Sequence, residues 1–120
     1  MAEGLDELLV RLRADNGLKL AAVSADGLVV AADGTDDVDA EDVCATVGDA
    51  YLMMTALGAE LGRGEPRQLT IEYDDGTVIV SPLEHGAVLI VVTQAAVNLG
   101  RLRIASRRFQ AQYQELSATS

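Results

Sequence analysis

Residues 43–61, with the sequence VCATVGDAYLMMTALGAEL, decide how this chain can fold. The stretch reads as one helix, in which Asp49 and Glu60 are the only charged residues. A helix on the surface of a small domain needs one apolar stripe to cover the core. We expect that stripe to consist of Val43, Val47, Ala50, Met54, Leu57 and Leu61.

The other faces of this helix are also apolar, and a chain of 120 residues has little core with which to cover them. These faces carry Cys44, Gly48, Leu52, Ala56 and Ala59. Gly48 costs the helix about 1 kcal/mol relative to alanine, and such a glycine usually marks a close approach to the backbone. The second surface is therefore predicted to meet another copy of the protein or a different protein.

The composition favours one compact domain over residues 1–120, with 49% hydrophobic residues to build its core. Asp49 interrupts the closest candidate for a membrane span, and the acidic N-terminus lacks the basic start of a signal peptide. The single cysteine, Cys44, fits a reducing compartment and is expected to be a small buried residue. We therefore expect a cytoplasmic protein without membrane insertion. Arginine in place of lysine is typical of a high-GC bacterial genome.

The formal net charge of −10 argues against a nucleic-acid partner, because phosphates would be repelled. Tryptophan is absent and aromatic residues make up 3% of the chain, so a base-stacking platform is not expected either. The sequence therefore directs attention to protein partners.

The order of the patterns predicts an α+β fold, α-β-β-α-β-β-β-α, with one antiparallel sheet and helices on both faces. Turn signals at Asp26-Gly27, Asp75-Gly76 and His85-Gly86 separate neighbouring strands. The run AVLIVV at 87–92 predicts a central strand that is covered on both sides. The long helix should cover one face of the sheet, and the terminal helices the other. The expected helices are 3–15, 40–62 and 94–116, and the expected strands are 18–25, 28–33, 69–73, 78–82 and 87–92.

The acidic stretch at 33–42, DGTDDVDAED, resembles a calcium loop only superficially, because Cys44 stands where a bidentate glutamate belongs. Asp39 is instead predicted to cap the long helix, and Glu41 and Asp42 favour its positive end.

No set of residues suits a catalytic, cofactor or metal site. His85 falls in a turn and is expected to be exposed, and it lies on a different element from Cys44, so no nucleophile–base pair is indicated. The glycines Gly58, Gly62 and Gly64 end a helix instead of preceding one, which excludes a Walker-type phosphate loop. We expect no enzyme activity and no cofactor.

The last helix gathers positive charge in an acidic protein. Its arginines are Arg101, Arg103, Arg107 and Arg108. They form either a solvated face with local ion pairs or a docking edge for an acidic partner or another copy.

The ordered set of LDELLVRL, AAVSADGLVVAA, LGRGEPRQLTIEYDDGTVIVSPL, GAVLIVVT and VNLGRLRI resembles a roadblock-type domain over nearly the whole chain. The roadblock superfamily includes dynein light chains and bacterial partners of Ras-like GTPases. The resemblance implies a five-stranded antiparallel sheet, a homodimer, and a non-catalytic platform on which a small GTPase docks. It carries no catalytic residues over to this chain.

In that family the long helix pairs with its twin, and the following strand joins two sheets into one. The resemblance places this dimer interface on residues 43–61 and 68–74 and gives Gly48 the purpose of close helix approach. The interface residues it implies are Cys44, Val47, Gly48, Tyr51, Leu52, Thr55, Ala59, Leu69, Ile71 and Tyr73.

Two functions follow from these patterns. The first is a homodimeric adaptor or regulator of a Ras-like GTPase, with Arg101, Arg103, Arg107 or Arg108 as partner contacts. The second is a small-molecule sensor or assembly subunit without a GTPase, which a closed apolar pocket with a few converging polar groups would favour.

Overall fold

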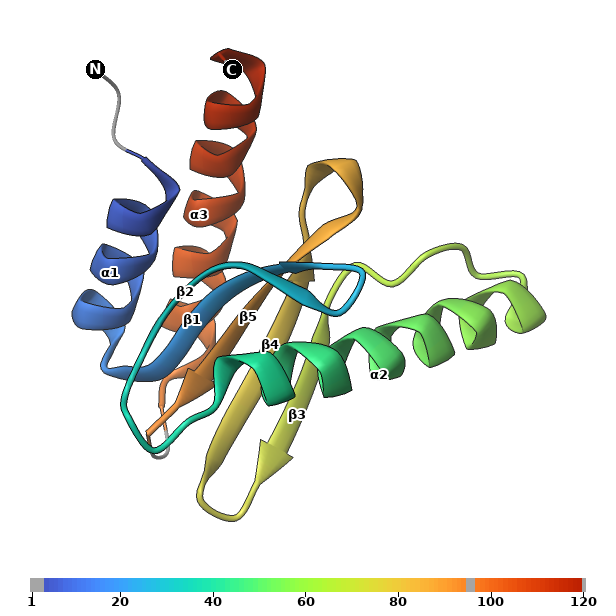
Figure 1. Ribbon diagram of the computed structural model, residues 1–120. Helices are drawn as coiled ribbons and strands as arrows, with labels where there is room; N and C mark the ends of the chain where they lie inside the picture. The colour runs from blue at the N-terminus through green and yellow to red at the C-terminus, as the bar shows by residue number, and fades with distance from the viewer. Residues whose placement is uncertain (1–3, 95–96, 120) are drawn as a thin grey trace.

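The computed structural model describes residues 4–94 and 97–119, which form a five-stranded antiparallel sheet between two helical layers (Figure 1). The long helix α2 crosses one face of the sheet, and α1 and α3 lie side by side on the other. This is the predicted α+β fold in the predicted element order. The elements are α1 (Leu5–Asn16), β1 (Leu18–Ala25), β2 (Leu28–Gly34), α2 (Ala40–Leu61), β3 (Leu69–Tyr73), β4 (Gly76–Pro82), η1 (Glu84–Gly86), β5 (Ala87–Thr93) and α3 (Leu99–Thr119).

The strand order β2-β1-β5-β4-β3 places β5 in the centre and leaves β2 and β3 at the edges. The predicted Asp26-Gly27 turn joins β1 to β2, and both residues have positive φ, at 54° and 77°. Positive φ at both central positions is what a type I′ hairpin turn requires.

Alternate side chains of β5 pack into the cores on the two faces of the sheet, which confirms the predicted central strand. Leu89 and Val91 belong to the core on the α1/α3 side, with Leu9 of α1 and Phe109 of α3. Ile90 belongs to the smaller core on the α2 side. A strand buried on both faces reads as a continuous apolar run because neither set of alternate side chains meets water.

Residues at the helix ends explain where α1 and α2 begin and stop. Gly17 takes the left-handed conformation after α1 and donates its N–H to the carbonyl of Arg13. The side chain of Asp39 accepts the backbone N–H groups of Glu41 at 3.0 Å and Asp42 at 3.2 Å, as predicted for an N-cap.

The last helix begins later than its apolar periodicity suggested. The expected start at residue 94 is wrong, because α3 begins at Leu99, and residues 95–96 of the expected helix lie outside the described part. Asn98 provides the reason, since its Oδ1 accepts the N–H of Arg101 at 3.1 Å. A side chain that bonds the first turn in this way fixes the helix start, whereas apolar spacing reports only the buried face.

Candidate protein-interaction surface

The outward side of α2 is the most apolar exposed surface among the described residues. Leu52 is 69% exposed and Met53 is 67% exposed, although both lie on a helix within the fold. We call the following set the α2 apolar face: Leu52, Met53, Met54, Leu57 and Leu61. Clustered exposure of this kind marks an association surface more often than scattered single residues do.

The stripe expected to face the core was placed partly on the wrong side of α2. Val43 and Val47 do pack on the sheet, but Met54, Leu57 and Leu61 are exposed. When nearly every residue of a helix is apolar, periodicity cannot choose the inner face. In addition, the C-terminal half of α2 extends past the sheet (Figure 1), so its side chains have little of their own domain to cover.

Gly48 has a role within the chain that differs from the expected contact with a twin helix. A Cβ placed on Gly48 would lie 2.8 Å from the Cα of Gly27 and 3.1 Å from its nitrogen. The glycine therefore lets α2 approach the β1–β2 hairpin turn. The expected approach of a twin helix at Gly48 stays a prediction.

Cys44 is completely buried between α2 and the sheet. It therefore cannot contact a second copy, and its place in the expected dimer interface is wrong. Burial raises the pKa of its thiol, which leaves it protonated at neutral pH. Its other expected role, as a small buried residue, is confirmed.

Tyr51 and Thr55 lie partly buried along the inner margin of α2. Burial raises the pKa of the Tyr51 hydroxyl, and the nearby Glu65 carboxylate adds to this shift. The Thr55 hydroxyl donates to the carbonyl of Tyr51 at 2.9 Å. Of the expected interface residues on α2, Leu52 and Ala59 present exposed surface, whereas Val47, Tyr51 and Thr55 are only partly accessible.

The edge strand β3 adds a second apolar strip on the same side of the sheet. Leu69 packs into the α2-side core, and the two-residue repeat of a strand puts Ile71 and Tyr73 on that side as well. Ile71 is 39% exposed and Tyr73 is 63% exposed. Because β3 pairs with β4 on one side only, its outer backbone groups can accept another strand.

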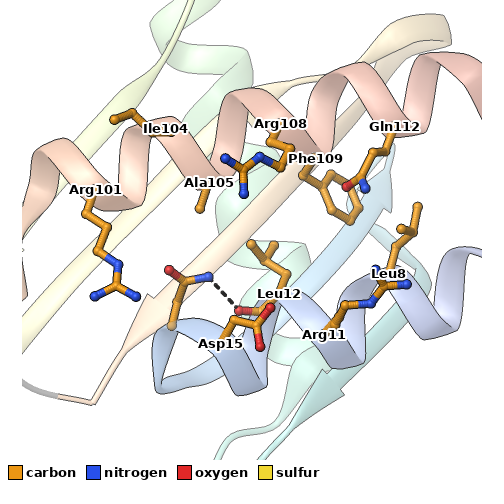
Figure 2. Close-up of a pocket in the computed structure, with 11 residues that line it drawn as sticks. Leu8, Arg11, Leu12, Asp15, Arg101, Ile104, Ala105, Arg108, Phe109 and Gln112 are labelled. Carbon is orange, nitrogen blue, oxygen red and sulfur yellow. Dashed lines mark hydrogen bonds between the residues drawn. The ribbon is translucent and has the colours of Figure 1, made fainter.

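The four arginines expected at a docking edge all lie exposed on α3, across the sheet from α2. The structure does not keep them together. Arg101 and Arg108, with Arg11 of α1, line a groove of about 470 Å³ between α1 and α3 (Figure 2). Arg103 and Arg107 do not line this groove.

Another groove, of about 440 Å³, lies between α2, the β1–β2 turn and the β4–β5 connection. Ser24 lines it with a buried hydroxyl. The groove opens to solvent and does not form the closed pocket that would favour small-molecule sensing.

His85 occupies an exposed turn with a φ of 61°, as predicted from its position between two strands. Within residues 4–94 and 97–119, no three His, Cys, Asp or Glu side chains gather in a way that could hold a metal ion. None of the described helices combines the length and hydropathy needed to cross a bilayer.

The sequence profile of the Roadblock/LC7 domain matches residues 4–93. The chain belongs to the Roadblock/LC7 family. The match ends before α3, so the arginines of that helix lie outside it.

This Roadblock/LC7 domain has archaeal relatives in Methanocaldococcus jannaschii. It is 36% identical to the uncharacterised protein MJ0310 over 105 residues, which are 87% of this chain and 91% of that protein. It is 34% identical to the uncharacterised protein MJ0714 over 105 residues, which are 87% of this chain and 88% of that protein.

Solved structures of bacterial proteins share the fold of the Roadblock/LC7 domain. MglB of Myxococcus xanthus superposes with a TM-score of 0.87 at 16% identity, over 98% of this chain and 100% of that one. A Roadblock/LC7 domain from Streptomyces avermitilis superposes with a TM-score of 0.87 at 23% identity, over 97% of this chain and 99% of that one. Because the matched relatives are archaeal and the similar structures are bacterial, the bacterial origin inferred from composition stays a prediction.

Sequence reasoning missed two parts of the Roadblock/LC7 surface. The expected interface range 43–61 contained Met53, Met54, Leu57 and Leu61, but these residues were not named among its contacts, although their density on one helix was the available signal. Sequence reasoning also did not connect Arg11 with the arginines of α3, because the two helices stand at opposite ends of the chain and only folding brings them together.

Proposed function

We propose that this Roadblock/LC7 domain, formed by residues 1–120, is a non-catalytic homodimeric adaptor or regulator in the cytoplasm. A Ras-like small GTPase would dock on the dimer, with either a GTPase-activating or a scaffolding outcome. The observation that carries the proposal is the α2 apolar face, which a solitary domain would leave in water. The family supports the GTPase as partner, because the roadblock resemblance implies such a platform.

In the proposed dimer, α2 packs against α2 of the second copy and the two β3 edges pair, so that two sheets continue as one. Both surfaces lie on one side of the sheet, which allows one contact to cover them together. Pairing at β3 would also satisfy the outer backbone groups of an edge strand. The proposed contact residues are Val47, Gly48, Tyr51, Leu52, Met53, Met54, Thr55, Leu57, Ala59, Leu61, Leu69, Ile71 and Tyr73.

Partner docking is proposed for Arg101, Arg103, Arg107 and Arg108 on α3. These side chains are exposed on the side of the sheet away from α2, so dimerisation through α2 would leave them accessible. The alternative function is a sensing or assembly subunit without a GTPase. In that case the dimer would still form, but its interactions would not depend on a bound GDP or GTP.

The test is to purify the protein together with a Ras-like GTPase encoded beside its gene, loaded with GDP or with a non-hydrolysable GTP analogue. We expect a stable complex in one nucleotide state, detected by size-exclusion chromatography with light scattering. GTP hydrolysis with and without the protein separates activation from scaffolding. A dimer that neither binds the GTPase in either state nor alters hydrolysis would contradict the GTPase proposal and favour the alternative.

A further inference from the structure

The groove between α1 and α3 is a built surface that dimerisation through α2 does not use. Its floor is apolar, since Leu12 is 8% exposed and Phe109 is 2% exposed. Ile104 stands at the rim and is 59% exposed. Figure 2 shows Leu12 and Phe109 between the two helices, with arginines on both sides of them.

Most of the charged side chains that line this groove are positive, whereas the protein as a whole is negative. Arg101 and Arg108 come from α3 and Arg11 comes from α1, whereas Asp15 is the carboxylate in the lining. Arg101 and Arg108 therefore give the α3 side of the groove two guanidinium groups in a chain of net charge −10. Guanidinium groups bind carboxylates through two parallel hydrogen bonds, which makes arginine a selective residue for acidic partners.

The spacing of the rim residues matches a helical ligand. Arg101, Ile104 and Arg108 stand at i, i+3 and i+7, so they form one row along α3. The two arginines are separated by about 10 Å along the helix axis. A partner helix with an apolar stripe could cover Ile104 and the floor while its carboxylates, two turns apart, meet the two arginines.

We propose that the α1–α3 groove binds an acidic amphipathic helix from a partner protein. This inference deepens the partner-docking role proposed above for α3, but it depends neither on the α2 dimer nor on the partner being a GTPase.

The acidic loop of a second copy of this chain, residues 33–42, does not match the groove. This loop is partly engaged within its own domain, since Asp33 pairs with Arg13 at 2.7 Å and Asp37 pairs with Lys19 at 2.6 Å. The apolar residue within that stretch, Val38, packs against the α2-side core. The occupant is therefore expected to be a different protein.

The probe is a fluorescein-labelled designed peptide of about 15 residues, long enough to span the groove as a helix. It carries a leucine stripe flanked by glutamates two turns apart. A scrambled peptide of the same composition and a peptide with lysine in place of glutamate serve as ligand controls. Binding is measured by fluorescence anisotropy, and the contact is located by NMR shifts of Ile104 and Phe109 in the unmodified protein.

We expect the Arg101→Glu/Arg108→Glu variant to bind the designed peptide at least about tenfold more weakly, since two charge-assisted contacts are lost. The matched variant Arg63→Glu/Arg67→Glu has the same charge change at two exposed positions outside the groove, in the connection between α2 and β3. It should change binding by less than about threefold, and Ile104→Ser should weaken binding without any change of charge. Circular dichroism checks that each variant is folded.

Three results would overturn the inference: no binding of the designed peptide, equal binding of the scrambled peptide, or equal losses in the two arginine variants. A change in molecular mass of the Arg101→Glu/Arg108→Glu variant would instead assign the groove to contacts between copies. If the protein forms the dimer and the GTPase complex but does not bind the peptide, only the proposal for the groove is rejected. If the protein binds the peptide but forms no dimer or no GTPase complex, only the proposed function is rejected.

Discussion

The two faces of the sheet are covered in different ways. On the α1/α3 side, two helices cover the sheet, and their leucines and Phe109 form a continuous buried core with it. On the other side, α2 has 22 residues, but Cys44 is the one that is fully buried. A face covered by two amphipathic helices can be completed within one chain, whereas a single apolar helix leaves a surface that needs a partner.

The largest expected effect comes from placing a charge on the incomplete side. Leu52→Glu should yield a folded monomer, because the side chain is 69% exposed in one copy and is buried only in the proposed dimer. Burying unpaired carboxylates there would raise the dimer dissociation constant by about a hundredfold or more. Light scattering measures the mass and circular dichroism the fold.

Val10→Glu is the matched control for this substitution. It puts the same carboxylate on an exposed position of α1, on the side that its own chain has completed. It should leave the mass unchanged. If Leu52→Glu stays dimeric and folded, the contrast between the two sides is lost.

The contact between α2 and the β1–β2 hairpin turn predicts a loss of stability when Gly48 is replaced. Gly48→Ala should destabilise the fold by about 1–3 kcal/mol, because the new methyl group meets the backbone of Gly27 and the helix must shift. This loss would exceed the gain of about 1 kcal/mol in helix propensity. Urea unfolding at one protein concentration measures it.

The control for Gly48→Ala is Gly100→Ala in α3. The nearest atom to its added Cβ is the side-chain oxygen of Asn98 at 3.3 Å, which can move. We expect a change within about 0.5 kcal/mol. Equal effects at the two glycines would mean that α2 is not seated on the hairpin turn as described.

A smaller effect is expected at the start of α2. Asp39→Ala removes the acceptor for the N–H groups of Glu41 and Asp42 and should cost about 1 kcal/mol in urea unfolding. Asp36→Ala removes the same charge from the same exposed loop and should have little effect. A comparable loss at Asp36 would assign the change to net charge and not to capping.

The smallest effect concerns the loop that leads into α2. The Lys19 side chain, followed by that of Thr35, lowers the pKa of Asp37 from 3.8 to about 2. Because the folded pKa is the lower one, this contribution to stability is present above pH 4 and is lost as the pH falls towards 2. In Lys19→Gln, an NMR titration should show the pKa of Asp37 moving up towards 3.8. An unchanged pKa would contradict the ion pair.

Much of the fold could be predicted because its signals are local. The Asp26-Gly27 turn, the Asp39 cap and the apolar run of β5 each act through neighbouring residues, and the structure confirms all three. The start of α3 was misplaced because the cap at Asn98 is one polar side chain within an apolar pattern. The excess apolar surface of α2 was also predicted, with Leu52, Ala56 and Ala59 correctly facing outward. Met54, Leu57 and Leu61 were wrongly expected to face the core.

The sequence by itself determined that one helix carries more apolar surface than a small domain can bury, since composition alone fixes the amount. Only the tertiary structure decided where that surface lies, because the packing of Val43 and Val47 against the sheet leaves Leu52 and Met53 facing outward. Folding also brought Arg11 to the same groove as Arg101 and Arg108, which stand far from it in the chain. Hydrophobic content is additive along a sequence, whereas the orientation of a helix and the assembly of a groove depend on contacts between distant segments.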